Sequence, residues 1–241
     1  MPMNPLFDDR FAPITSSIGF IETDLPTAVR SFVRWQEPIQ SPRGVVLATR
    51  SIAGELAAAI MALPPLTSVE ARRFLFVATA SPWVAFFDNG HRGTDATGPM
   101  AYLARTMGCR AMRVVAIPHH EPKRANGQWR GRYGATILDL FGPEVKNHSN
   151  TIRSITMMND GGKWTFDELG DRLPFEDPEA YKARRIRDRF PVELLARYLK
   201  QLGLEPFDES FYRSQAMLVE KHGPCAPALK EYSLEEVRAA L

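Results

Sequence analysis

The sequence provides little for disulfide bonding or for membrane insertion. Its 241 residues include only two cysteines, Cys109 and Cys225, which do not make a disulfide framework. The longest apolar run, residues 56–66, contains two prolines and is well short of the roughly 20 residues that cross a bilayer. The first residues show no basic segment followed by an apolar one. We therefore expect a cytoplasmic protein without membrane contact, with Cys109 as a buried free thiol.

An excess of one charge sign is also absent. The chain has 30 lysines and arginines against 28 aspartates and glutamates, which gives a net charge of +2. This balance creates no long-range field that would attract nucleic acid or an anionic lipid surface. Any basic patch must therefore be local, and the composition disfavours nucleic acid as a partner.

Signatures of catalysis are missing as well. The sequence contains no G-x-S-x-G, P-loop, G-x-G-x-x-G, H-E-x-x-H or C-x-x-C pattern, so no nucleophile, phosphate loop or metal pair is indicated. With 44% hydrophobic and 24% charged residues, the composition is that of a globular protein. We assign no catalytic residue, cofactor or metal ligand from the sequence, and favour a protein that is not an enzyme.

Residues 81–118 show the organisation that the rest of the chain follows. An apolar strand at 83–87 leads through a polar, glycine-rich loop at 88–98 into a helix at 99–107, and a second strand follows at 110–117. Gly108 is placed for a left-handed cap of that helix. Further strands are predicted at 14–22, 44–49, 72–78, 134–141, 151–158, 163–166 and 211–221, and further helices at 25–35, 52–63, 177–189, 191–202 and from 233 onwards.

These elements predict a single α+β domain over residues 1–241, with a mostly antiparallel central sheet flanked by several helices. A weak internal similarity leaves a second organisation open. Trp83 with the triplet at 103–105 and Trp164 with the triplet at 195–197 would correspond in a duplicated β-β-α unit, with halves at 1–143 and 144–241.

The loop at 88–95 is the sharpest candidate site. Its polar side chains are those of Asp88, Asn89, His91, Arg92 and Asp95. Turn formation and capping of the next helix by Thr94, Asp95 or Thr97 explain most of this composition. Binding of an anion by backbone N–H groups, or of a divalent metal by Asp88, His91 and Asp95, remains an alternative, although the spacing matches no specific metal motif.

Three further polar clusters stand out. His119 and His120 follow the strand at 110–117, and a polar excursion with a basic segment at 123–132 and Trp129 comes next. Basic side chains beside aromatics can bind single-stranded nucleic acid. The expected helix at 177–189 carries Arg184 and Arg185, where local ion pairs or an acidic partner would explain the charge.

Four stretches, WVAFFDNGHRGTD, YLARTMGCRAMRV, NDGGKW and YKARRIRDRF, resemble a group of uncharacterised bacterial cytoplasmic proteins, some of which look like immunity proteins of polymorphic-toxin systems. The resemblance implies a non-enzymatic protein-binding module, an antidote that covers a toxin's active surface. Because antidotes to nucleases tend to be acidic and this chain is slightly basic, a nuclease is disfavoured as the target. The alternatives are an enzyme whose site joins residues 88–95 to His119 or His120, and nucleic-acid binding by residues 123–132.

Overall fold

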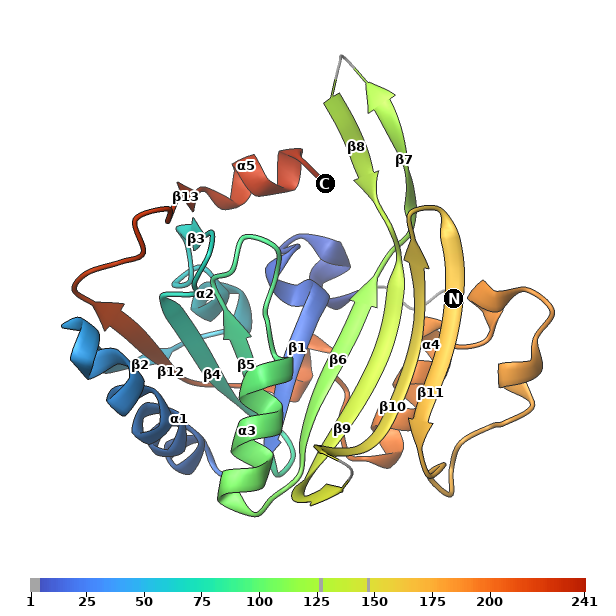
Figure 1. Ribbon diagram of the computed structural model, residues 1–241, viewed down its shortest axis with the longest axis horizontal. Coiled ribbons are helices and arrows are strands. Elements are labelled where there is room, and N and C mark those ends of the chain that lie inside the picture. Colours follow the sequence, from blue (N-terminus) through green and yellow to red (C-terminus); the bar gives the residue numbers. More distant parts are fainter. Residues whose placement is uncertain (1–4, 126–127, 147) are drawn as a thin grey trace.

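A computed structural model describes residues 5–125, 128–146 and 148–241 (Figure 1). Within these residues, nine strands form one open antiparallel sheet in the order β11-β10-β9-β6-β1-β5-β4-β12-β2. The α+β class and the antiparallel central sheet predicted from the sequence are confirmed. None of the described helices is both long enough and apolar enough to span a membrane.

The strands of the large sheet have the following bounds, from one edge to the other: β11 (Lys163–Gly170), β10 (Ser149–Asp160), β9 (Ala135–Lys146), β6 (Ala111–Ile117), β1 (Ser17–Glu22), β5 (Trp83–Asp88), β4 (Arg73–Thr79), β12 (Tyr212–His222) and β2 (Val46–Ala53). Two small antiparallel pairs lie outside it. The first joins β3 (Leu66–Thr67) to β13 (Glu231–Tyr232), and the second joins β7 (His120–Ala125) to β8 (Gln128–Arg132).

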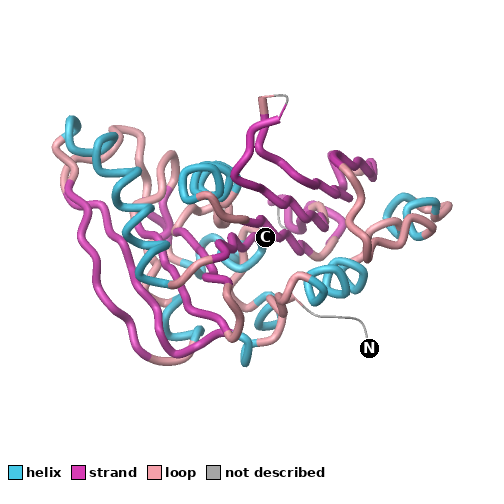
Figure 2. The backbone as a smooth tube through the Cα atoms, turned by 90° about the horizontal axis from the view of Figure 1, so that it is seen from below, coloured by secondary structure: helices cyan, strands magenta, loops and turns pink. Residues whose placement is uncertain are grey.

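Strand β5 shows why the middle of the sheet reads as a continuous apolar run. All six of its residues are buried. Trp83, Ala85 and Phe87 belong to one hydrophobic core, whereas Val84 and Phe86 belong to the other. Because helices and loops cover both faces, neither face of the strand can be polar. Figure 2, turned by 90°, shows helices on both sides of the strands.

Helices α1 (Leu25–Gln40) and α3 (Thr97–Met107) cover one face. Asp24 caps α1 as predicted, because its side chain accepts a hydrogen bond from the backbone N–H of Thr27 at 2.8 Å. Phe32 of α1 packs against three phenylalanine rings of the sheet. The αL conformation of Gly108 ends α3 as predicted, with φ of 68°.

Helices α2 (Leu56–Ile60) and α4 (Val192–Gln201) lie against the other face. The 3-10 turns η1 (Leu6–Asp9), η2 (Ile14–Ser16) and η6 (Glu209–Phe211) add apolar side chains to the same core. Trp83 fixes α4, since its indole N–H donates to the carbonyl of Leu202 at 3.0 Å. The last helix, α5 (Leu234–Ala239), begins with the predicted capping box of Ser233 and Glu236.

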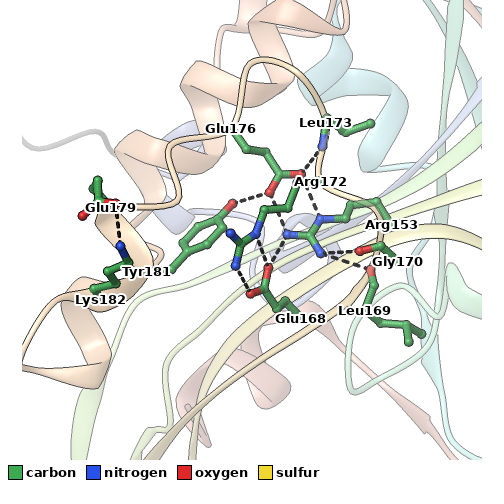
Figure 3. A network of polar contacts seen from close by, with 10 residues as sticks. All are labelled: Arg153, Glu168, Leu169, Gly170, Arg172, Leu173, Glu176, Glu179, Tyr181 and Lys182. Atoms are coloured by element: carbon green, nitrogen blue, oxygen red, sulfur yellow. Dashed lines mark hydrogen bonds and ion pairs between the residues drawn. The ribbon is translucent and has the colours of Figure 1, made fainter.

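The prediction of a helix at 177–189 is wrong. Two short 3-10 turns, η4 (Ala180–Lys182) and η5 (Ile186–Asp188), stand in its place. Side-chain contacts with the sheet shape this segment, because Glu176 binds Arg153 of β10 and also accepts the hydroxyl of Tyr181 (Figure 3). Tertiary contacts have overridden the local helix signal here.

Residues 44–63 also differ from expectation. The strand placed at 44–49 as buried is β2, which forms an edge of the sheet and leaves Val46 67% exposed. It continues through Ala53, so the helix expected at 52–63 shortens to α2, which has Glu55 rather than Ser51 at its N-cap. Ile52 packs its apolar side chain on the core from a strand instead of a helix.

Two elements continue past the prolines and glycine that were expected to end them. Helix α1 passes Pro38 and ends at Gln40, since a proline in the last turn removes only one intrahelical bond. Strand β9 passes residues 142–143 and ends at Lys146, while β10 accommodates it with register shifts between Ser149 and Arg153. A short turn, η3 (Ser41–Arg43), follows α1.

The duplicated β-β-α unit and its two halves stay a prediction. The hairpins β4–β5 and β10–β11 are each followed by a helix. The strand after α3, β6, lies two places from β5 in the sheet, whereas the strand after α4, β12, crosses the sheet to the place next to the edge strand β2. One sheet therefore unites strands from both proposed halves.

Candidate functional site

The loop at 88–95 is built around the buried carboxylate of Asp88, at the end of β5. Its Oδ1 accepts the backbone N–H of Gly90 at 2.8 Å and its Oδ2 accepts that of Asp95 at 3.0 Å. Thr94 donates to the carbonyl of Ile14 at 3.0 Å and accepts from the N–H of Asp88. The turn chemistry expected for this loop is confirmed. The expected side-chain cap of α3 is wrong, because Ala96 occupies the N-cap position and makes no such bond.

Asn89 is a structural residue, with 1% of its surface exposed. Its amide donates to the carbonyl of Pro65 at 2.7 Å, and its Oδ1 accepts the N–H groups of Arg72 and Arg73 at 2.8 and 3.0 Å. The side chain thereby satisfies three backbone groups that would otherwise be unpaired. Because it is almost fully buried, it offers almost no surface to a ligand.

His91, Arg92 and Asp95 are the residues of the loop that reach the surface. Arg92 and Asp95 are exposed, whereas His91 is half-buried. The His91 ring stacks on Tyr232 with centroids 5.4 Å apart, and its Nδ1 lies 3.2 Å from the carbonyl oxygen of Thr67. Among the described residues, no group of three or more histidine, cysteine, aspartate or glutamate side chains is placed to hold a metal ion.

A cavity of about 370 Å³ opens beneath this loop, on the face covered by α1 and α3. Asp88 lines it together with Phe32 and Trp35 of α1, Phe74 of β4 and Lys221 of β12. The sheet register brings these residues together: Asp88 pairs with Phe74, and Phe74 pairs with Val219, two residues before Lys221.

Burial perturbs both charged groups at the floor of this cavity. Desolvation raises the pKa of Asp88 to about 7, against the opposing effect of the N–H groups of Gly90 and Asp95. Desolvation also lowers the pKa of Lys221, while the carboxylate of Glu70 opposes that change. The Lys221 ammonium lies 3.8 Å from Glu70 Oε2 and 5.3 Å from the centroid of the Phe74 ring. A carboxyl and an amine with shifted pKa values in one cavity are typical of a functional site.

Sequence reasoning found Asp88 and missed Lys221 and Glu70. The alternation of β12 carries a signal that would have found the lysine. Val219 is buried in the core under α1, and Lys221 lies two residues later on the same face. A lysine at an inward-facing strand position is rare without a partner or a role.

The structure does not bring the two histidines to this site. His119 and His120 line a different cavity, of about 600 Å³, together with Met157 and Trp164. Those two residues belong to the core under α4, on the opposite face of the sheet. His119 accepts the N–H of Gly134 at 3.2 Å. In the described part of the chain, residues 88–95 and the two histidines therefore line separate cavities.

The other two clusters lie elsewhere. The excursion at 119–133 is the hairpin β7–β8, in which Lys123 is exposed; the side chain of Trp129 lies outside the described residues. Arg184 and Arg185 are exposed in the segment between η4 and η5, and η5 contacts β11.

Comparison with known proteins adds no relative: no family model, curated protein or solved structure matches this chain.

Proposed function

We propose that the chain is a non-enzymatic protein-binding module, of the kind that an immunity-type antidote would be, and that the hairpin β7–β8 is its main contact element. The observation that supports this is the position of the hairpin. It extends beyond the nine-stranded sheet, and β7 and β8 pair with each other in a separate two-stranded sheet (Figure 1). A projecting β-ribbon offers backbone and side chains to a partner with little rearrangement.

The base of the hairpin is held in place. Arg132 forms an ion pair with Asp9 and donates to the hydroxyl of Ser16 at 3.2 Å. The backbone N–H of Gly131 donates to the carbonyl of Leu241 at 2.6 Å, which ties the hairpin to the end of α5. A ribbon anchored in this way loses less conformational entropy when it binds.

The charge of the hairpin indicates what it binds. Residues 120–132 contain four basic side chains, at positions 123, 124, 130 and 132, and the single acid Glu121. Asp9 neutralises one of the four. The hairpin therefore complements an acidic concave surface on another protein. Arg92, an exposed residue of the loop at 88–95, lines a cavity together with Glu236 and Leu241, so the charges at this end are mixed outside the hairpin itself.

Site-specific crosslinking tests the proposal. A photo-reactive residue is placed at Lys123 of the full chain, and a second variant carries it at the remote Lys182, which is 69% exposed. We expect position 123 to capture a protein in the native host, and the purified partner to bind the wild-type chain. Lys123→Glu should weaken this binding by about tenfold, with steep salt dependence, whereas Lys182→Glu should not.

Three results would contradict the proposal: equal capture from both positions, capture of RNA or DNA in place of protein, or binding of the purified partner that Lys123→Glu leaves unchanged. Capture of nucleic acid would support the nucleic-acid alternative instead, and its binding should then fall linearly on logarithmic axes as salt rises.

A further inference from the structure

The cavity under the loop at 88–95 has an aromatic wall whose side chains are already fixed. Phe32 packs on Phe74 with ring centroids 4.8 Å apart. Trp35 meets Phe32 edge-on at 5.7 Å and stacks on Tyr102 at 4.4 Å. Phe32 is 1% exposed and Phe74 6% exposed. These contacts hold the rings in place before any ligand arrives, and this lowers the entropy that binding costs.

Glu70 and Lys221 line the polar end of the cavity, and two arginines outside its lining, Arg72 and Arg43, share the Glu70 carboxylate. A single carboxylate, that of Glu70, lies within 4 Å of three cations: Arg72 at 3.4 Å, Arg43 at 3.8 Å and Lys221 at 3.8 Å. The side chain of Lys221 is only 7% exposed, so water screens it poorly. Arg72 is kept in the cluster because it donates to three backbone carbonyls, those of Lys221, Gly223 and Pro224.

Two further carboxyls line the cavity, those of Asp88 and Asp95, together with Arg92. Asp95 and Arg92 are both exposed to solvent, so Asp88 is the buried one. Asp88 is 3% exposed, and its oxygens are occupied by the N–H groups of Gly90 and Asp95. Its raised pKa, about 7, means that a large share of the molecules hold it protonated at neutral pH. The protonated form would donate a hydrogen bond to an anion instead of repelling it.

From this arrangement we propose that the cavity binds a small planar organic anion, such as an aromatic carboxylate. The ring would lie against Trp35, the half-buried member of the aromatic wall, and the anionic group beside the Lys221 ammonium. The volume of about 370 Å³ suits a ligand of one or two rings, at the lower end of the range for ligand sites. This binding site contains no residue of the hairpin β7–β8.

Titration of the isotope-labelled full chain with small probes, followed by NMR, tests the proposal. Benzoate and indole-3-carboxylate carry the required ring and charge, while benzylamine and benzyl alcohol share the ring alone. We expect saturable shifts of the Trp35 indole N–H and of the backbone amides of Phe74 and Lys221 with both carboxylates. Benzylamine should bind more weakly by about tenfold or more.

Two variants distinguish specific binding in this cavity from nonspecific binding elsewhere on the protein. Lys221→Gln should weaken benzoate by about tenfold and leave benzyl alcohol unchanged. Lys200→Gln, at a side chain 70% exposed and paired with Glu205, should change neither. Benzylamine binding as well as benzoate would overturn the proposal, as would carboxylate shifts that map away from Trp35. If Lys221→Gln does not fold, the wild-type shift map and the comparison of probes decide the question without it.

Discussion

Arg153 is a deeply buried charge, and its removal gives a sharp test of how the segment at 171–190 is held (Figure 3). Its side chain is 1% exposed. Its Nε and Nη2 donate to the two oxygens of Glu176 at 2.8 and 2.7 Å, and Nη2 also donates to Glu168 at 2.6 Å. Its Nη1 donates to the carbonyls of Leu169 and Gly170 at 3.3 and 3.0 Å.

The expected cost of Arg153→Met follows from what it leaves behind. The carboxylate of Glu176 is also 1% exposed, and without the arginine it keeps only the N–H of Leu173 and the hydroxyl of Tyr181 as donors. A buried ion that loses its counter-ion costs about 3–5 kcal/mol, a large part of the 5–15 kcal/mol by which a typical domain is stable. Arg172 binds Glu168 from a side chain 50% exposed, so Arg172→Met should cost about 1 kcal/mol or less.

Urea unfolding followed by circular dichroism measures both free energies. We expect Arg153→Met to lower the midpoint strongly with little change of the slope. The double variant Arg153→Met, Glu176→Leu should recover part of the loss, because it removes the orphaned carboxylate as well. The reasoning is refuted if Arg153→Met lowers the free energy of unfolding no more than Arg172→Met does. It is also refuted if the double variant is clearly less stable than Arg153→Met alone.

Two further predictions concern a glycine and an acid. Gly170 has φ of 84°, and a Cβ there would overlap the carbonyl oxygen of Ile152, whereas a Cβ on Gly161, with φ of 58°, would meet open space. Gly170→Ala should therefore destabilise the fold beyond the roughly 1–2 kcal/mol of a left-handed alanine, and Gly161→Ala should cost only that amount; equal thermal midpoints would contradict this. Folding raises the pKa of Asp88 from 3.8 to about 7. Between these pH values the folded state keeps the proton, whereas the unfolded state has lost it. The free energy of unfolding therefore falls as pH rises across this range, by up to about 4 kcal/mol. In Asp88→Asn, the free energy of unfolding should not show this decline between about pH 5 and about pH 8, as measured by urea unfolding. Parallel pH profiles for the two proteins would contradict the prediction.

Local signals were sufficient for much of the fold. Asp24 and Ser233 begin helices as their side chains predict, and the turn at 159–162 joins β10 to β11 as its asparagine and glycines predict. Each of these features depends on residues within a few positions of one another. The prediction for the segment at 177–189 was wrong for the opposite reason. Its proline and alternating charges favour a helix, but Glu176 is committed to Arg153 on a distant strand, and no apolar stripe offsets that contact.

The candidate site could be predicted only in part, because its two halves meet through strand order. Asp88 follows an apolar strand and was evident as a polar loop residue. Lys221 reaches it only because β12 inserts between β4 and β2, which places Lys221 near Phe74, the cross-strand partner of Asp88. Local sequence does not specify that insertion. Alternation within β12 does specify that Lys221 faces inward, as Val219 does. A buried lysine is costly unless a carboxylate or a ligand compensates it, and Glu70 is already shared with two arginines. Strand alternation therefore makes one part of the site visible, a buried lysine whose carboxylate partner is shared with two arginines, and this is the reason to test the site with anions first.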